Sequence, residues 1–155
     1  MADARLLVVW HSNSGRTRVM VDALLTGARD PDAGAVSVRD VPALEATADD
    51  FRRAAGVLLA TPAHFGYMSG ALKHCFDTVY EPLLDETRGL PYALVVKGRS
   101  DTDGAVAAVH KIVTGLVWKE VRPPLTVVGD VTDEHLAACT ELGQTMAAGL
   151  AMGIF

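Results

Sequence analysis

The chain has 155 residues, of which 50% are hydrophobic and 21% charged, a balance that predicts one domain over residues 1–155 and excludes a disordered chain. Its 14 basic residues are outnumbered by 19 acidic ones, and the net charge of −5 lacks the basic excess that binding to a nucleic-acid backbone requires. Its longest apolar runs, residues 54–60 and 146–155, fall short of the ~20 residues of a membrane-spanning helix.

Five short apolar runs are predicted as strands. In chain order they are residues 6–10, 35–38, 57–60, 92–96 and 125–128. They are nearly continuous in Val, Leu and Ala, which is typical of strands that are buried on both faces of a parallel sheet.

The segments between these strands show helical periodicity. Apolar residues recur at a spacing of three and four over residues 21–28, 72–79, 106–116 and 136–150. A shorter helix is predicted over residues 47–55, because Thr47 and Asp50 form a capping-box pattern. Strand and helix alternate along the chain, which predicts a three-layer α/β fold with helices on both faces of the sheet.

Three glycine-containing loops follow predicted strands, at residues 11–15, 61–70 and 98–104. In open parallel sheets, ligands bind at the carboxyl ends of the strands. We therefore expect a binding site at these three loops.

The first loop carries hydroxyls and a glycine between a strand and a helix. Its residues are Ser12, Asn13, Ser14, Gly15, Arg16 and Thr17. A helix N-terminus presents unpaired N–H groups to a phosphate, glycine allows a close backbone approach, and arginine adds charge. An ordinary serine-rich turn is the alternative, and the position between strand and helix favours the phosphate site. The loop matches neither GxxxxGK[ST] nor GxGxxG, which argues against ATP, GTP and a Rossmann-type dinucleotide.

Ser12, Ser14, Gly15 and Thr17 fill the pattern [ST]-x-[ST]-G-x-T, which resembles the FMN phosphate loop of flavodoxins. The second loop reads TPAHFGYMSG and is similar to the TPxRFGNMSG stretch of tryptophan-repressor-binding-protein-like NAD(P)H:quinone oxidoreductases. The resemblance extends over the whole chain. It implies a flavodoxin-like fold whose five-stranded parallel sheet has the order 2-1-3-4-5, with FMN as cofactor.

The resemblance also implies which residues surround FMN. Residues 12–17 would hold the phosphate, and the second loop would run along the isoalloxazine ring. The second-loop residues are Thr61, Pro62, Ala63, His64, Phe65, Gly66 and Tyr67. Phe65 or Tyr67 would stack on the ring, and backbone groups near Gly66 would meet its redox-active nitrogen, although Gly66 could instead serve only a tight turn.

Two second-loop residues depart from the oxidoreductase pattern, since His64 replaces Arg and Tyr67 replaces Asn. His64 is the one candidate for acting on substrate protons, the alternative being a surface or ring-edge contact. The third loop matches neither family and is assigned to the other side of the flavin by position alone. Its candidate residues are Lys97, Gly98, Arg99 and Asp103. Asp101 and Asp103 are also expected to cap the fourth helix.

The cysteines and histidines indicate neither a metal nor a disulfide. Cys75 and Cys139 lie far apart without a CxxC pair, and the five histidines show no ligand spacing. Cys75 falls on an apolar helix stripe and is predicted to be a core residue. The apolar run of residues 6–10 is shorter than the ~7 to 15 residues of a signal-peptide core, so we expect a cytoplasmic protein.

The resemblance predicts an FMN-dependent oxidoreductase that passes electrons from a reductant, NAD(P)H being the candidate, to a quinone or similar small acceptor. The alternative is a flavodoxin that carries single electrons between redox proteins. Electron carriers of this type generally have a strong negative charge, so the mild net charge of −5 modestly favours the enzyme over the carrier. A domain that keeps the fold without the flavin is disfavoured by the intact phosphate loop. Related oxidoreductases form dimers or tetramers, and a homodimer is our hypothesis here.

Overall fold

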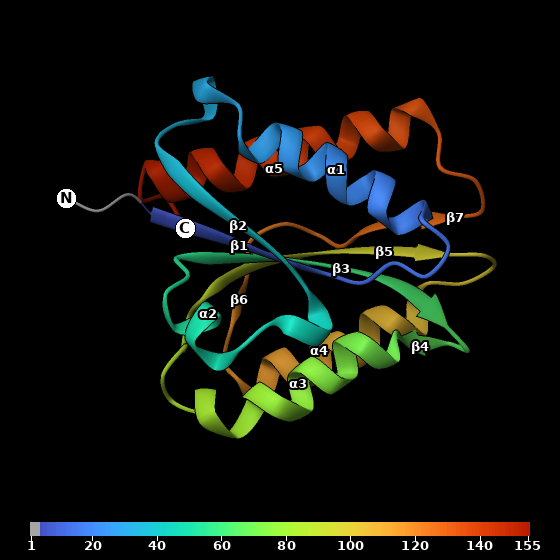
Figure 1. Ribbon diagram of the computed structural model, residues 1–155, viewed down its shortest axis with the longest axis horizontal. Coiled ribbons are helices and arrows are strands. Elements are labelled where there is room, and N and C mark those ends of the chain that lie inside the picture. The colour runs from blue at the N-terminus through green and yellow to red at the C-terminus, as the bar shows by residue number, and fades with distance from the viewer. Residues whose placement is uncertain (1–3) are drawn as a thin grey trace.

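The computed structural model describes residues 4–155, in which helices cover both faces of a central sheet (Figure 1). The strands are β1 (Ala4–Trp10), β2 (Val36–Pro42), β3 (Gly56–His64), β4 (Tyr67–Met68), β5 (Pro91–Gly98), β6 (Lys119–Glu120) and β7 (Leu125–Val128). The helices are α1 (Arg16–Ala28), α2 (Ala48–Arg52), α3 (Gly70–Leu83), α4 (Asp103–Gly115) and α5 (Asp133–Ala151), with short 3-10 turns at Pro31–Ala33 and Ala43–Glu45.

The main sheet is parallel and has the order β2-β1-β3-β5, followed by β6 and β7. β6 and β7 pair with successive parts of the same strand, β5, and so form one interrupted edge strand. Pro123 and Pro124 lie in the interruption, where a missing N–H group would break the ladder. The predicted strand order is confirmed, and the short strands β4 and β6 are additions to it.

Alternate residues of the central strands pack against opposite helix layers. Leu6 and Val8 of β1 belong to a buried cluster that also contains residues of α1 and α5, whereas Leu7 and Val9 belong to the cluster that contains residues of α3 and α4. Figure 1 shows α1 and α5 on one side of the sheet and α2, α3 and α4 on the other. This arrangement confirms the predicted three layers. In residues 4–155, no helix has both the length and the apolar character needed to cross a membrane.

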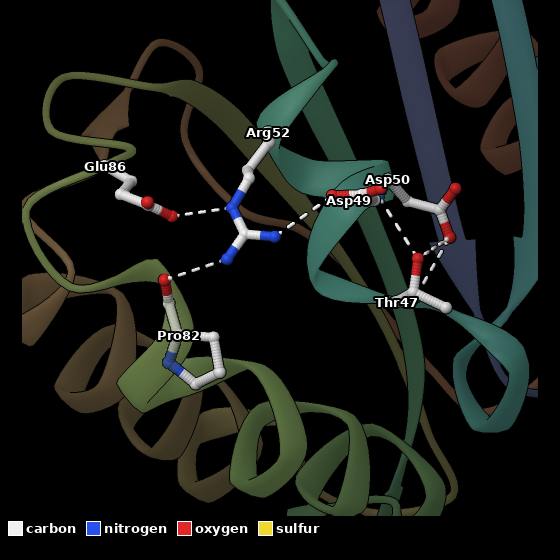
Figure 2. Close-up of polar contacts among 6 residues, drawn as sticks. All are labelled: Thr47, Asp49, Asp50, Arg52, Pro82 and Glu86. Carbon is white, nitrogen blue, oxygen red and sulfur yellow. Dashed lines mark hydrogen bonds and ion pairs between the residues drawn. The ribbon is translucent and has the colours of Figure 1, made fainter.

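Helix α2 is short, and polar contacts secure both of its ends (Figure 2). The predicted capping box is present, since Thr47 Oγ1 accepts from the Asp50 N–H at 3.3 Å and Asp50 Oδ2 accepts from the Thr47 N–H at 2.9 Å. Arg52 lies 2.6 Å from Glu86 and 3.0 Å from Asp49, and it donates to the carbonyl of Pro82. The helix ends at Arg52, earlier than predicted, because the backbone N–H of Ala55 donates to the Arg5 carbonyl of β1 instead of continuing the helical hydrogen bonds.

Candidate functional site

The parallel strands β1, β3 and β5 end at the same edge of the sheet. The segments that follow them are residues 11–15, the hairpin of β3 and β4, and residues 99–102. The structure therefore brings the three predicted loops to one edge.

The first loop is folded around the side chain of Ser12. Its Oγ atom accepts hydrogen bonds from the backbone N–H of Gly15 at 3.1 Å and of Arg18 at 3.2 Å. Gly15 has a φ of +90°, a left-handed conformation that suits glycine, and the helix begins directly after it. This turn places the loop at the positive end of the α1 dipole.

Several donors of this loop have no acceptor within residues 4–155. They are the backbone N–H groups of Asn13, Ser14, Arg16 and Thr17. Thr17 is only 2% exposed, and its hydroxyl also forms no hydrogen bond in this part of the chain. Free amides at a helix N-terminus are well suited to a phosphate, so the loop fits the phosphate of FMN.

A second cluster, which the sequence analysis missed, holds the start of α1 against β2. Trp10 Nε1 donates to Asp40 Oδ1 at 2.5 Å, and the guanidinium of Arg18 lies 4.4 Å from the centre of the Trp10 ring. Arg18 also forms ion pairs with Asp22 at 2.9 Å and with Asp40 at 3.5 Å. These contacts fix the helix turn that presents the free amides.

The second loop is largely a hairpin, which corrects the predicted loop over residues 61–70. β3 continues to His64, and β4 pairs with it across the two-residue turn of Phe65 and Gly66. Both turn residues have positive φ, +52° and +71°, as a type I′ turn requires. The positive φ of Gly66 is therefore explained by its position in this turn.

The residues of this hairpin differ in accessibility. Thr61 is fully buried, and its hydroxyl donates to the Pro62 carbonyl at 2.8 Å and accepts from the Ser69 N–H at 3.0 Å. Thr61 therefore supports the start of α3. Phe65 is fully exposed and Tyr67 is 41% exposed, so both aromatic side chains are accessible beside the strand ends. Ala63 and His64 are half-buried.

The third segment combines buried and exposed cations. Lys97 is 7% exposed, and its ammonium donates to the Gly98 carbonyl at 2.9 Å. Burial lowers its pKa, and the nearby charge of Arg16 lowers it further, while Asp130 acts in the opposite direction. Lys97 thus lies near the first loop, and Arg99 is exposed beside it.

The start of α4 differs from the prediction that two aspartates cap it. Asp101 Oδ1 accepts from the Asp103 N–H at 2.9 Å, so Asp101 does act at the helix start. Asp103 is instead the first residue of the helix, and the N-cap residue Thr102 makes no side-chain cap. Asp103 is exposed and favourably placed at the positive end of the helix dipole.

Gly104 brings the second and third segments together. A Cβ atom on Gly104 would overlap the carbonyl oxygen of Gly66 and would lie 2.8 Å from its carbonyl carbon. The first turn of α4 therefore packs directly on the Phe65-Gly66 turn. No pattern in the sequence indicated this contact of Gly104.

His11 is a further residue that the analysis of motifs passed over. It follows β1, and the pKa of its imidazole lies below the ordinary value because of burial and, secondarily, because of the nearby His64. The two imidazoles thus come from adjacent strand ends. By contrast, Cys75 is a core residue as predicted, and burial raises the pKa of its thiol to about 12.

Comparison with known proteins identifies the family. Residues 13–133 match the family described as NADPH-dependent FMN reductase. The chain belongs to this family. It is 31% identical to a flavodoxin of Aquifex aeolicus, over 55% of this chain and 45% of that protein. It is 32% identical to an NAD(P)H dehydrogenase (quinone) of Acidithiobacillus ferrooxidans, over 48% of this chain and 46% of that protein.

The chain thus spans less than half the length of either relative. A solved structure of a flavodoxin from the domain Archaea has a TM-score of 0.81 at 19% identity, over 94% of this chain and 98% of its own. The predicted flavodoxin-like fold is confirmed, and FMN is the cofactor that the family indicates.

Proposed function

We propose that this family member is an FMN-dependent oxidoreductase that takes electrons from NAD(P)H and passes them to a quinone or similar small acceptor. The observation that carries the proposal is the first loop, whose free amides and Thr17 hydroxyl lie at the N-terminus of α1. Family membership and the match to a quinone dehydrogenase support the reaction class.

The residues of the three segments have separate roles in this proposal. FMN, when bound, supplies the redox chemistry. Residues 12–17 bind its phosphate, and Arg16 adds charge from the exposed side. The hairpin orients the ring through the exposed aromatics Phe65 and Tyr67, while Arg99 and Asp103 border the opposite side. His64 is the half-buried imidazole available for a proton at the ring edge.

The second candidate is a flavodoxin-type electron carrier, which the match to the Aquifex aeolicus flavodoxin favours. Both candidates use the same phosphate loop and hairpin. They differ in whether a nicotinamide can reduce the bound flavin without a separate reductase. The mild net charge of −5 supports the enzyme, since a carrier that steers to basic partners gains from a stronger negative field.

Turnover with a nicotinamide separates the two candidates. FMN-loaded protein mixed with NADH or NADPH is expected to lose its flavin absorbance, and benzoquinone is expected to restore it over many cycles. The measurement is steady-state nicotinamide consumption at 340 nm. If neither nicotinamide reduces the flavin while a flavoprotein reductase does so rapidly, the carrier is the correct assignment.

Replacing Thr17 with valine tests the phosphate loop. Loss of a hydroxyl donor to a charged phosphate costs roughly 1.5 to 3 kcal/mol, so FMN affinity should fall while riboflavin affinity barely changes. Calorimetry with both ligands measures the difference. Thr26→Val is the matched control, because Thr26 is exposed on the same helix and its hydroxyl only donates to the Asp22 carbonyl. An equal loss for both ligands would mean that Thr17 does not contact the phosphate.

A further inference from the structure

A groove of about 710 Å³ lies at the free edge of the sheet, away from the three strand-end segments. Residues 37–40 of β2 form its floor. Arg5 of β1, Arg29 after α1, and Arg53 after α2 contribute to its sides, together with two aspartates of α2. Figure 1 shows β2 as the outermost strand, with α1 on one side of it and α2 on the other. We call this feature the β2 groove.

The carboxylates of the β2 groove are already paired. Asp40 accepts from Trp10 and lies 3.5 Å from Arg18, and Asp49 pairs with Arg52 at 3.0 Å. Asp50 pairs with Arg39 at 2.6 Å, and the pKa of its carboxyl is lowered by the hydrogen bond with that arginine. These carboxylates are therefore largely neutralised and would attract a cationic ligand only weakly.

Three arginines of the groove, by contrast, are not neutralised by a carboxylate in the described chain. Within residues 4–155, Arg5, Arg29 and Arg53 form no ion pair. Arg29 and Arg53 are also exposed, on opposite sides of β2. The charge that the groove offers to a ligand is consequently positive.

The floor of the groove adds a second, independent feature. β2 pairs with β1 on one side, and no strand in the described part of the chain pairs with its other side. An unpaired strand edge presents a row of N–H and C=O groups that can receive another strand. An extended peptide satisfies these groups, whereas a small anion leaves them unpaired.

We propose that the β2 groove binds an extended acidic peptide segment of a partner protein, which adds to the sheet beside β2. Backbone hydrogen bonds to residues 37–40 hold the segment, and its carboxylates pair with Arg29 and Arg53. A second copy of this chain fits less well, because the carboxylates of its own β2 groove are already paired with arginines and would have to leave them to pair with Arg29 and Arg53. The groove thus provides an interaction surface separate from the proposed flavin site.

A capped peptide of Thr-Thr-Glu-Glu repeats, long enough to cover the seven residues of β2, tests the proposal, because this repeat places glutamates on both faces of the added strand. We expect it to bind the full chain, to bind more weakly in high salt, and to protect from hydrogen exchange those amides of residues 37–40 that point away from β1. Arg29→Gln and Arg53→Gln should each weaken binding roughly two- to fivefold, as expected for exposed ion pairs. Arg122→Gln, at an exposed arginine outside the groove, is the control and should leave binding unchanged.

Three outcomes would overturn the proposal. The first is equal binding of a matched Thr-Thr-Gln-Gln peptide, which would mean that the arginines are not used. The second is binding of pyrophosphate that the arginine variants weaken, without any amide protection by the Thr-Thr-Glu-Glu peptide, which would identify a small-anion site. The third is self-association of the protein that buries β2, seen by sedimentation. Because both substituted arginines are exposed, thermal unfolding of the variants should match that of the unsubstituted chain.

Discussion

Replacing Gly104 with alanine is expected to destabilise the protein and to weaken FMN binding together. The new Cβ atom would overlap the Gly66 carbonyl oxygen, and it would meet backbone rather than a flexible side chain. Either the first turn of α4 or the Phe65-Gly66 turn must therefore move. Overpacking of this kind costs roughly 1 to 3 kcal/mol of the free energy of unfolding.

The loss of affinity follows from what the displaced turn carries. Phe65 and Tyr67 flank Gly66, so a shift of the turn moves both proposed ring contacts. Fluorescence titration with FMN and urea unfolding of the apoprotein measure the two effects. Gly70→Ala is the matched control: Gly70 is also at the start of a helix, α3, but a Cβ there meets nothing within 4 Å. It should be neutral or slightly stabilising.

Two results would contradict the expected effect of Gly104→Ala. If Gly104→Ala unfolds at the same urea concentration as the unsubstituted protein and binds FMN equally well, the hairpin and α4 are not coupled. If stability falls but FMN affinity does not, the contact is structural only and the ring does not depend on the position of the turn.

The main features of the fold could be predicted because each depends on a local pattern. Continuous apolar runs indicated β1, β3 and β5, which are buried on both faces, whereas the edge strands β2 and β7 are partly exposed. The Thr47 and Asp50 pair indicated the start of α2. β4 and β6 have only two residues each, too few to show a period. The hairpin escaped prediction because Phe65 occupies a left-handed position that usually selects Asn, Asp or Gly.

The candidate site could likewise be predicted only where it depends on residues that are contiguous in sequence. The first loop is contiguous in sequence, so its position between β1 and α1 was predictable. The contact of Gly66 with Gly104, and the cluster of Trp10, Arg18 and Asp40, join residues that are far apart along the chain. Such contacts are set by strand pairing and helix packing. No local signal in the sequence reveals them.

Replacing Lys97 with methionine is expected to stabilise the apoprotein at neutral pH while weakening FMN binding. Lys97 is a buried residue whose ammonium has one carbonyl partner, and no carboxylate in the described chain forms an ion pair with it. Methionine has a similar length without the charge. Removal of an incompletely satisfied buried cation should raise the free energy of unfolding by about 1 kcal/mol.

The affinity for FMN is expected to fall, although stability rises, because the ligand is negatively charged. Lys97 lies near Arg16 of the first loop, where the phosphate is proposed to bind. Loss of the cation should weaken FMN about tenfold, equivalent to about 1.4 kcal/mol, and should affect riboflavin much less. Lys111→Met, at an exposed position on α4, is the control for loss of charge alone.

The pH dependence distinguishes a charge effect from a packing effect. The pKa of Lys97 is lowered in the folded protein, so in the alkaline range below the ordinary lysine value of 10.5 the unfolded chain holds more protons than the folded one. Stability therefore rises with pH through that window, and this rise should be absent from Lys97→Met. A bound phosphate favours the ammonium, so FMN binding should take up protons in the same window. Calorimetry in buffers of different ionisation enthalpy measures that uptake, and equal uptake by the variant would mean that Lys97 is not the group that responds to the phosphate.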